Sequence, residues 1–280
     1  MTLEEARAQV ANRLRAAGIV SAEVEALLLL EAAVKLSRSE LILSPSRELT
    51  AREQTVLEQW LVRREGREPL QHILARSHFY GLELVVGPGV FIPRPETEQL
   101  VVLCLETLRG VADPKVLEVG TGSGAIALAI KCRRPDAEVV ATDISTEALN
   151  VAATNAQRLG LAVSFLRADL LDTPAVKEIA ARVGLMVSNP PYLPDRDRAV
   201  VSPEVKRDPE SALYGGRSGL RQARRLERQA RRLLTPGAVL LMELDPRNVR
   251  AALESSRGWA DASIFEDLAG RERFLKLVKG

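Results

Sequence analysis

Cysteine and histidine are scarce in this sequence, and their scarcity limits the chemistry that the chain can support. Its 280 residues include only Cys104, Cys132, His72 and His78 of these two types. No C-x-x-C or Cys/His spacing is present, so the sequence predicts neither a disulfide framework nor a zinc site. Two histidines are also too few for a histidine-rich metal centre. We therefore expect no metal ion.

The chain also lacks a long apolar run and a large net charge. Its longest purely aliphatic run, ALLLL at Ala26 to Leu30, is far short of the ~20 apolar residues of a membrane span. The acidic start MTLEEARAQV is not typical of a signal peptide. A formal charge of +2, from 39 basic and 37 acidic side chains, argues against nucleic-acid binding by bulk electrostatics. We expect a monomeric cytoplasmic protein that binds neither membrane nor DNA.

Changes in pattern along the chain predict two domains joined by a hairpin. Apolar residues at helical spacing, with Ser21 and Thr50 as N-caps, predict a small all-helical domain over residues 1–76. Aromatic and β-branched residues separated by turn glycines predict a β-hairpin linker over 77–93. Strand and helix patterns alternate over 94–280, which predicts an α/β fold with a Rossmann-like sheet and helices on both faces. Ligands of such sheets bind at the carboxyl ends of the strands.

A glycine-rich loop, LEVGTGSGAIA, follows the first predicted strand of the sheet. Gly120, Gly122 and Gly124 allow a sharp turn and a close backbone approach, and the following helix offers N–H donors at its N-terminus. The spacing is G-x-G-x-G and no Walker lysine follows, so a phosphate ligand is disfavoured. Alone, the loop is a weak signal because several nucleotide-binding families use such loops.

Acidic residues end the next two predicted strands. Asp143 lies 19 positions after Gly124, where a carboxylate can accept hydrogen bonds from both hydroxyls of a ribose. Asp169 suits the amino group of an adenine. Both acids could instead cap helices, and the glycines could form ordinary turns. Glu118 is also open, because it could orient the glycine loop, orient one end of a bound ligand, or be satisfied within the strand end.

The stretch MVSNPPYLP ends the fourth predicted strand with an unusually stiff backbone. Two consecutive prolines restrict Asn189 and Pro190 to extended geometry. An amide side chain, a free carbonyl and the ring of Tyr192 are thereby held at one edge of the sheet. The stretch predicts either a rigid loop or a small polar receptor.

The ordered set of glycine loop, two strand-end acids and N-P-P-Y resembles the class I S-adenosylmethionine-dependent methyltransferases. This resemblance implies a seven-stranded sheet and S-adenosylmethionine as the cofactor. It implies that the cofactor binds to Gly120, Thr121, Gly122, Ser123, Gly124, Asp143, Ile144, Asp169, Leu170 and Asn189.

In methyltransferases that this chain resembles, the N-P-P-Y motif holds a planar nitrogen. Such a nitrogen is a poor nucleophile because its lone pair is delocalised, so it requires alignment. The resemblance implies that Asn189 and Pro190 accept its two N–H bonds, with Pro191 and Tyr192 completing the acceptor site. Tyr192 would stack on the planar group or form a wall beside it. In-line transfer then gains much of its rate from proximity and orientation.

Three longer stretches resemble the HemK family of release factor glutamine methyltransferases: GVFIPRPETEQLV, EPLQHILARSHFYGLEL and EVKRDPESALYGGRSGL. Members of this family modify the glutamine of the Gly-Gly-Gln tripeptide in class I peptide chain release factors, which act in translation termination. The resemblance covers essentially the whole chain. It implies transfer to the glutamine N5 nitrogen, a release factor as partner, an N-terminal domain that helps to dock it, and a cofactor roof at Phe91 to Arg94.

The chain departs from the family pattern at three places, and two other functions remain alternatives. Glu118 replaces an aspartate, Asp208 replaces a glutamate, and ELDPRN replaces a glycine-containing segment, so we assign no role to residues 244–248. The PRPETE stretch could also simply start a helix, with Pro95 first. Methylation of an exocyclic amine of adenine or guanine in DNA or rRNA is one alternative function. A non-catalytic binding module is the other.

Overall fold

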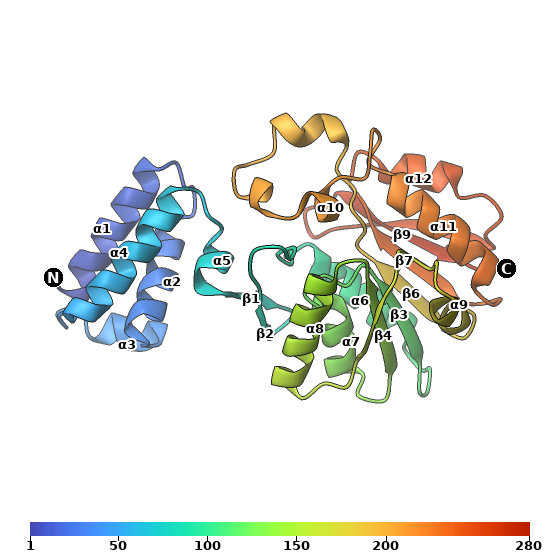
Figure 1. Cartoon of the computed structure of the whole chain (residues 1–280), viewed down its shortest axis with the longest axis horizontal. Coiled ribbons are helices and arrows are strands. Elements are labelled where there is room, and N and C mark those ends of the chain that lie inside the picture. The colour runs from blue at the N-terminus through green and yellow to red at the C-terminus, as the bar shows by residue number, and fades with distance from the viewer. The chain divides into compact units, whose positions relative to one another are not determined.

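The structure, a computed structural model, describes residues 1–280 and divides into two compact units (Figure 1). The first unit comprises Met1–Ala75 and Ser202–Arg207. The second comprises Arg76–Val201 and Asp208–Gly280. The predicted helical domain contained no segment after residue 76, so the prediction missed the inclusion of Ser202–Arg207 in this unit. No helix in either unit is both long enough and apolar enough to cross a membrane.

The first unit is helical because its apolar residues line one side of each helix and meet in a common core. Leu14, Leu29 and Leu61 are fully buried there. Thr50 caps its helix by a capping box, as predicted, whereas the Ser21 hydroxyl donates to Glu25 and caps nothing. The helices are α1 (Leu3–Ala16), α2 (Ala22–Val34), α3 (Arg38–Leu43), α4 (Ala51–Glu65) and α5 (Leu70–Leu74).

Ion pairs attach the late segment Ser202–Arg207, which contains the 3₁₀ turn η2 (Val205–Arg207), to this helical unit. The Glu204 carboxylate accepts from Arg67 Nε at 2.6 Å and from Arg64 Nη1 at 3.0 Å. Buried Arg64 also donates to Glu25 at 2.6 Å. Burial raises the pKa of Glu204, but the hydrogen bonds from both arginines outweigh it and lower the pKa to about 2.

The second unit begins with an antiparallel hairpin followed by a seven-stranded sheet. In the hairpin, β1 (Arg76–Phe79) pairs with β2 (Leu82–Val85), and both turn residues, Tyr80 and Gly81, have positive φ, as a tight hairpin requires. The sheet order is β5-β4-β3-β6-β7-β9-β8, and β9 alone runs in the direction opposite to the other six strands. The strands are β3 (Lys115–Val119), β4 (Glu138–Asp143), β5 (Ser164–Arg167), β6 (Leu185–Ser188), β7 (Val239–Glu243), β8 (Asp261–Glu266) and β9 (Glu272–Val278).

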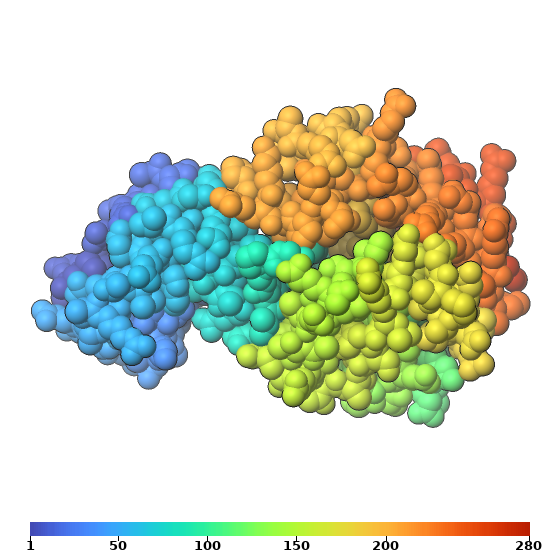
Figure 2. Space-filling model, in the orientation of Figure 1, coloured from blue at the N-terminus to red at the C-terminus, as the bar shows by residue number.

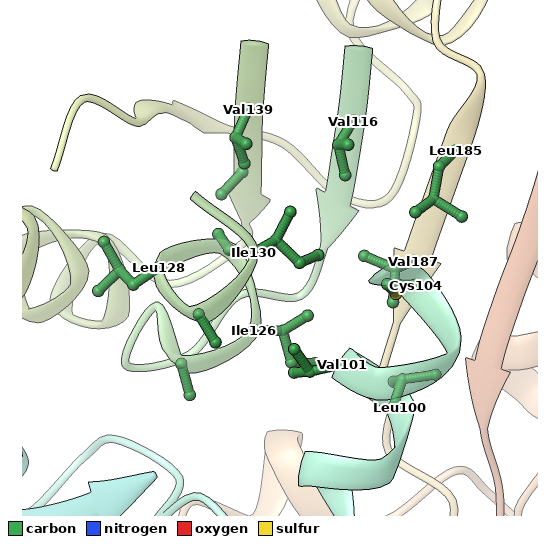
Figure 3. Packing of buried hydrophobic residues seen from close by; sticks show 14 of the residues in the cluster. Leu100, Val101, Cys104, Val116, Ile126, Leu128, Ile130, Val139, Leu185 and Val187 are labelled. Carbon is green, nitrogen blue, oxygen red and sulfur yellow. The ribbon is translucent and has the colours of Figure 1, made fainter. Parts of the chain in front are cut away.

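Helices cover both faces of this sheet, which confirms the predicted Rossmann-like fold. Side chains alternate along β3, so Val116 joins one core cluster and Leu117 the other. Figure 3 shows side chains of α6 and α7 directed toward β3, β4 and β6 in the first cluster. Helices α9, α11 and α12 supply the second. The helices are α6 (Thr97–Thr107), α7 (Ala125–Arg133), α8 (Thr146–Leu159), α9 (Pro174–Ala180), α10 (Glu210–Leu213), α11 (Arg221–Leu233) and α12 (Val249–Ser255), with the 3₁₀ turn η1 (Asp195–Ala199).

The PRPETE stretch forms a turn before it forms a helix. The N–H of Thr97 bonds to the carbonyl of Arg94, and α6 begins at Thr97 with Glu96 as its N-cap residue. The alternative in which Pro95 occupies the first helical position is therefore wrong by two residues. The extra turn places Thr97 at the start of α6, where its side chain lines the cavity described next.

Candidate active site

A cavity of about 820 Å³ opens at the carboxyl ends of β3, β4, β5 and β6, all within the second unit. Its volume is in the range of small-molecule sites. Figure 2 shows the surface hollowed between the segment after β6, in light orange, and the loops after β4 and β5, in yellow-green. Gly124, Pro190 and Tyr192 do not line the cavity. The predicted residues that line it are Gly120, Thr121, Gly122, Ser123, Asp143, Ile144, Asp169, Leu170, Asn189 and Pro191.

The glycine loop forms one wall, and its glycines serve two different purposes. Gly120 and Gly122 have φ of +78° and +56°, and a Cβ on either would meet nothing within 4 Å. These two glycines therefore supply backbone freedom and leave open room beside the cavity. A Cβ on Gly124 would lie 3.0 Å from Leu128 Cδ1 and 3.1 Å from Ala152 Cβ. Gly124 thus permits α7 to pack against α8, which explains why it does not line the cavity.

Glu118, in β3 directly before the glycine loop, orients this loop. Its buried Oε2 accepts from the hydroxyl of Thr121 at 2.6 Å and from the N–H of Ala127 at 3.1 Å. Burial raises the pKa of Glu118 to about 8, and the charge of Asp143 adds to that rise, while the two hydrogen bonds oppose it. Of the roles left open for Glu118, orientation of the glycine loop is the one that these contacts favour.

Two polar side chains in the wall are arranged to receive a ligand. Asp143 accepts from the N–H of Gly122 and of Ser145, both at 2.9 Å, so its carboxylate is fixed at the cavity edge with lone pairs to spare. The Ser123 hydroxyl is buried, lines the cavity and has no partner. An unpartnered buried hydroxyl is costly unless a ligand satisfies it. These groups fit the sugar of a nucleoside-containing cofactor.

At the next strand end, α11 holds the loop that carries Asp169. Arg225 Nη1 donates to both carboxylate oxygens of Asp169, at 2.9 and 2.8 Å, and the same guanidinium pairs with Asp172. Leu170 has a positive φ of 52°, an uncommon conformation for a leucine, and lines the cavity. No sequence motif indicates that Arg225, 56 positions after Asp169, holds this loop.

At the end of β6, Asn189 brings its amide to the cavity. Its Nδ2 donates to Thr97 Oγ1 at 3.2 Å, so Oδ1 is the amide atom that remains available to a ligand. The Tyr192 hydroxyl donates instead to Glu243 Oε1 at 3.4 Å. Burial raises the pKa of the Tyr192 phenol. The stacking of Tyr192 on a ligand stays a prediction, since in the structure Tyr192 does not line the cavity and its hydroxyl contacts Glu243.

A glycine segment after the motif supports it by direct backbone packing. The N–H of Gly215 donates to Leu193 O at 2.9 Å, and a Cβ on Gly215 would lie 2.4 Å from Pro191 O. A Cβ on Gly219 would lie 2.1 Å from Tyr192 O. Only glycine fits at either position, so the YGGRSGL stretch holds the N-P-P-Y backbone in place.

The predicted roof is held by a buried carboxylate. Phe91 and Pro93 line the cavity, whereas Arg94 stacks on Phe91 and pairs with Asp208. Burial raises the pKa of Asp208 to about 6 against the effect of Arg94. The rim also contains residues that were not predicted from the sequence, because they come from loops without a motif. These include Asp195, Arg198, Glu210, Arg221 and Gln222.

Residues 244–248, where the sequence departs from the family pattern, make ion pairs within the second unit. Arg247 donates to Asp245 at 2.8 Å and pairs with Asp197 of η1 at 2.5 Å. The segment therefore holds η1, which follows the N-P-P-Y motif, through an ion pair. No cluster of His, Cys, Asp and Glu side chains that could hold a metal ion is present.

Similarity to known proteins covers both units. A family model described as PrmC N-terminal domain matches residues 5–74, and one described as Methyltransferase small domain matches residues 82–210. A release factor glutamine methyltransferase of Deinococcus radiodurans is 44% identical over 278 residues, covering 99% of this chain and 98% of the relative. One of Streptomyces coelicolor is 41% identical, covering 95% and 94%. One of Koribacter versatilis is 38% identical, covering 98% and 97%.

Solved structures support the fold. The catalytic domain of hMettl16, in complex with an RNA hairpin, is similar with a TM-score of 0.57 at 13% identity, covering 81% of each chain. A T. thermophilus 16S rRNA methyltransferase, RsmC, in complex with AdoMet and guanosine, has a TM-score of 0.53 at 22% identity, covering 73% of this chain and 50% of that one. At such identities these structures show the methyltransferase fold alone. The near-full-length relatives show more: this chain belongs to the family of release factor glutamine methyltransferases.

Proposed function

We propose that the protein transfers a methyl group from S-adenosylmethionine to the side-chain N5 nitrogen of the glutamine in the Gly-Gly-Gln motif of a class I release factor. One observation carries this proposal. A single cavity is lined both by the glycine loop with Asp143 and by Asn189. Cofactor and acceptor could therefore meet in one cavity, as in-line transfer requires. Membership of the family supports the choice of acceptor.

The cofactor would bind to the wall formed by β3, β4 and β5. Asp143 would accept hydrogen bonds from the ribose hydroxyls, and the unpartnered Ser123 hydroxyl lies in the same wall. Asp169 would accept from the adenine amino group, with Leu170 packing against the ring. When bound, S-adenosylmethionine supplies an electrophilic methyl group on a sulfonium sulfur.

The acceptor amide would bind at the end of β6. Asn189 Oδ1 and the carbonyl of Pro190 would accept its two N–H bonds, which favours a nitrogen that becomes tetrahedral during attack. The lone pair of the nitrogen would then point toward the methyl group. The amide proton would leave late, to water or to a nearby carbonyl. Because the nitrogen is weakly nucleophilic, alignment by these two oxygens is the main contribution of the chain.

The two units would divide the work. The helical unit would help to dock the release factor, a role supported by the match of its residues 5–74 to the PrmC N-terminal domain. The second unit would carry out transfer. A protein that acts on release factors would work in the cytoplasm, where translation takes place.

An assay with labelled S-adenosylmethionine tests the proposal. The protein is incubated with a release factor, with the same factor carrying Gln→Ala in its Gly-Gly-Gln motif, and with DNA and ribosomal RNA. Label on the wild-type factor alone supports the proposal. Equal label on the Ala variant, or label on nucleic acid only, would contradict the proposal and show that the protein methylates another acceptor.

A further inference from the structure

One buried amide on α8 bonds to the hairpin and to the glycine loop at the same time. Helix α8 packs beside β2 (Figure 1), and Asn155 of α8 is only 1% exposed. Its Oδ1 accepts from the N–H of Val85 at 2.7 Å. Its Nδ2 donates to Val85 O at 3.0 Å and to Ser123 O at 2.9 Å. Val85 ends β2 and Ser123 belongs to the glycine loop, whereas Asn155 itself does not line the cavity.

The Asn155 amide bonds to β2 as a neighbouring strand would. The hairpin has only two strands, so the outer edge of β2 has no partner strand. The two hydrogen bonds between Asn155 and Val85 satisfy one N–H and one carbonyl of that edge. Both Nδ2 hydrogens are directed at carbonyl oxygens and Oδ1 at an N–H, so a reversed amide would lose all three hydrogen bonds. The contact therefore has a single orientation.

The helical repeat of α8 places Asn155 on the face that packs against the glycine loop. Ala148, Ala152 and Asn155 are four and three positions apart and so share one face of the helix. Ala148 lines the cavity, and a Cβ on Gly124 would lie 3.1 Å from Ala152 Cβ. Small apolar side chains suit such close packing. A buried asparagine on the same face is costly unless hydrogen bonds compensate its burial, which points to a role for those bonds.

The end of the hairpin that Asn155 holds continues directly into the roof of the cavity. Gly89 lies four positions after Val85 and lines the cavity, as does Phe91. A Cβ on Gly89 would lie 2.6 Å from the carboxylate of Glu147, which is in the first turn of α8. The segment from Val85 to Gly89 therefore contacts α8 at both of its ends. The same helix also carries the glycine loop, so α8 sets the distance between the two.

We propose that Asn155 is a positioning residue for S-adenosylmethionine, because its one amide fixes both the roof and the glycine loop on α8. The inference rests on the proposed function and adds to it a residue outside the cavity that controls cofactor affinity. Without this amide the roof segment would be free to leave α8. Only a fraction of the molecules would then have a cavity of the right width, and the apparent Kd rises in inverse proportion to that fraction.

Asn155→Leu tests this role, because leucine has the same branched shape and cannot form hydrogen bonds. We expect the Kd for S-adenosylmethionine, measured by calorimetry without a release factor, to rise by about tenfold or more. At saturating cofactor and release factor, kcat should stay within about threefold of wild type, because Asn155 does not contact the reacting groups. An unchanged Kd would overturn the inference.

Leu277→Ala is the matched control for a general loss of stability. Leu277 is fully buried in the second core cluster and does not line the cavity. This variant should lower the free energy of unfolding, measured with urea, and change the Kd for S-adenosylmethionine by less than about twofold. If both variants raised the Kd equally, the effect at Asn155 would be general destabilisation and the inference would be wrong.

Hydrogen exchange of the wild-type protein gives a measurement that does not depend on whether a variant folds. The Val85 N–H donates to Asn155 and Val85 does not line the cavity, so a ligand there does not cover it directly. Saturating S-adenosylmethionine should slow exchange of this amide by about tenfold, because the bound cofactor selects molecules in which the roof lies on α8. Equal exchange rates with and without cofactor would overturn the inference. Should the wild-type protein bind no S-adenosylmethionine in the calorimeter, the proposed function fails instead, so the two failures are distinguishable.

Discussion

Asn189 joins the two halves of the site, because it ends β6, lines the cavity and is held from behind by Thr97. Neighbouring strand ends supply Asp143 and Glu118 in the same way, each fixed by backbone donors of the glycine loop and the helix that follows it. Asn189 has one amide atom bound to the protein and the other left over, whereas both oxygens of Asp143 accept a backbone N–H and keep further lone pairs. The chemistry of the site thus depends on which atom of each group the surrounding chain occupies.

Removal of the Asn189 amide tests the residue that we place nearest to the reaction. Asn189→Ala should raise the activation free energy of transfer by ~2 kcal/mol or more and so lower kcat. A lost contact to the transition state reduces the rate and not the ground-state affinity. Cofactor binding, measured by calorimetry, should change by less than about tenfold. A loss of cofactor affinity equal to the loss of turnover would mean that Asn189 holds the cofactor and not the acceptor.

The buried Glu243 carboxyl should make stability depend on pH. Burial raises its pKa to about 7, opposed by Thr97, Arg273 and Tyr192 and assisted by the charge of Glu96. Because the folded chain then binds the proton more tightly than the unfolded chain, the stability contributed by this group is present at low pH. It is lost as the pH rises through about 7.

Comparison with Glu243→Gln isolates this effect from that of other titrating groups. The free energy of unfolding of the variant, relative to wild type, should increase by on the order of 2 kcal/mol between pH 5 and pH 8. Urea unfolding at the two pH values measures it. A difference that does not change with pH would show that Glu243 titrates in the folded chain as it does in the unfolded chain.

Among the elements, the loop after β6 depends most on its neighbours. Gly215 has ordinary φ, so only the backbone carbonyls around it exclude a side chain. Gly215→Ala should displace Pro191 O and lower kcat by about a hundredfold, because small displacements at a site have such effects. Gly184→Ala is the matched control, since its Cβ would meet nothing within 4 Å. Equal activity of the two variants would show that the loop accommodates the methyl group without consequence for the site.

Local patterns predicted the order of the elements and some of their ends, whereas they did not predict the distant partners that fix the site. The cap at Thr50, the glycine loop and the strand-end acids depend on residues adjacent in sequence, so the sequence is sufficient to predict them. Buried Asn155 illustrates the limit, because it bonds both Val85 of the hairpin and Ser123 of the loop. No local pattern marks such a residue, since its partners lie 32 and 70 positions away.

At the scale of the whole molecule, the chain passes between its two units three times, after Ala75, before Ser202 and after Arg207. Both later passages lie between the N-P-P-Y motif and Asp208, which pairs with Arg94 of the predicted cofactor roof. The helical unit therefore includes Ser202–Arg207, a segment that is joined in sequence to the loop of the N-P-P-Y motif on one side and to Asp208 on the other. Composition and periodicity could not reveal this, because the connection depends on Glu204 pairing with Arg64 and Arg67, more than 130 positions earlier.

The Glu204 ion pairs can be tested by stability and exchange. Glu204→Gln should destabilise the helical unit by ~1–3 kcal/mol, because it weakens the pairing of buried Arg64. Hydrogen exchange at Val205–Arg207 should become faster. The control is Glu138→Gln, whose exposed pair with Lys115 at 3.5 Å should contribute less than about 1 kcal/mol. Similar small effects of both variants would show that the segment is held by other contacts.

The atom that receives the methyl group is the centre of the proposed chemistry, and mass spectrometry of the product tests it most directly. A release factor is incubated with the protein and S-adenosylmethionine, digested, and fragmented to locate the added methyl group. We predict one methyl group on the side chain of the glutamine in the Gly-Gly-Gln motif, and a much lower yield of the same product in the same time when the protein carries Asn189→Ala. A methyl group on a different residue, or an equal yield from the Asn189→Ala protein, would contradict this prediction.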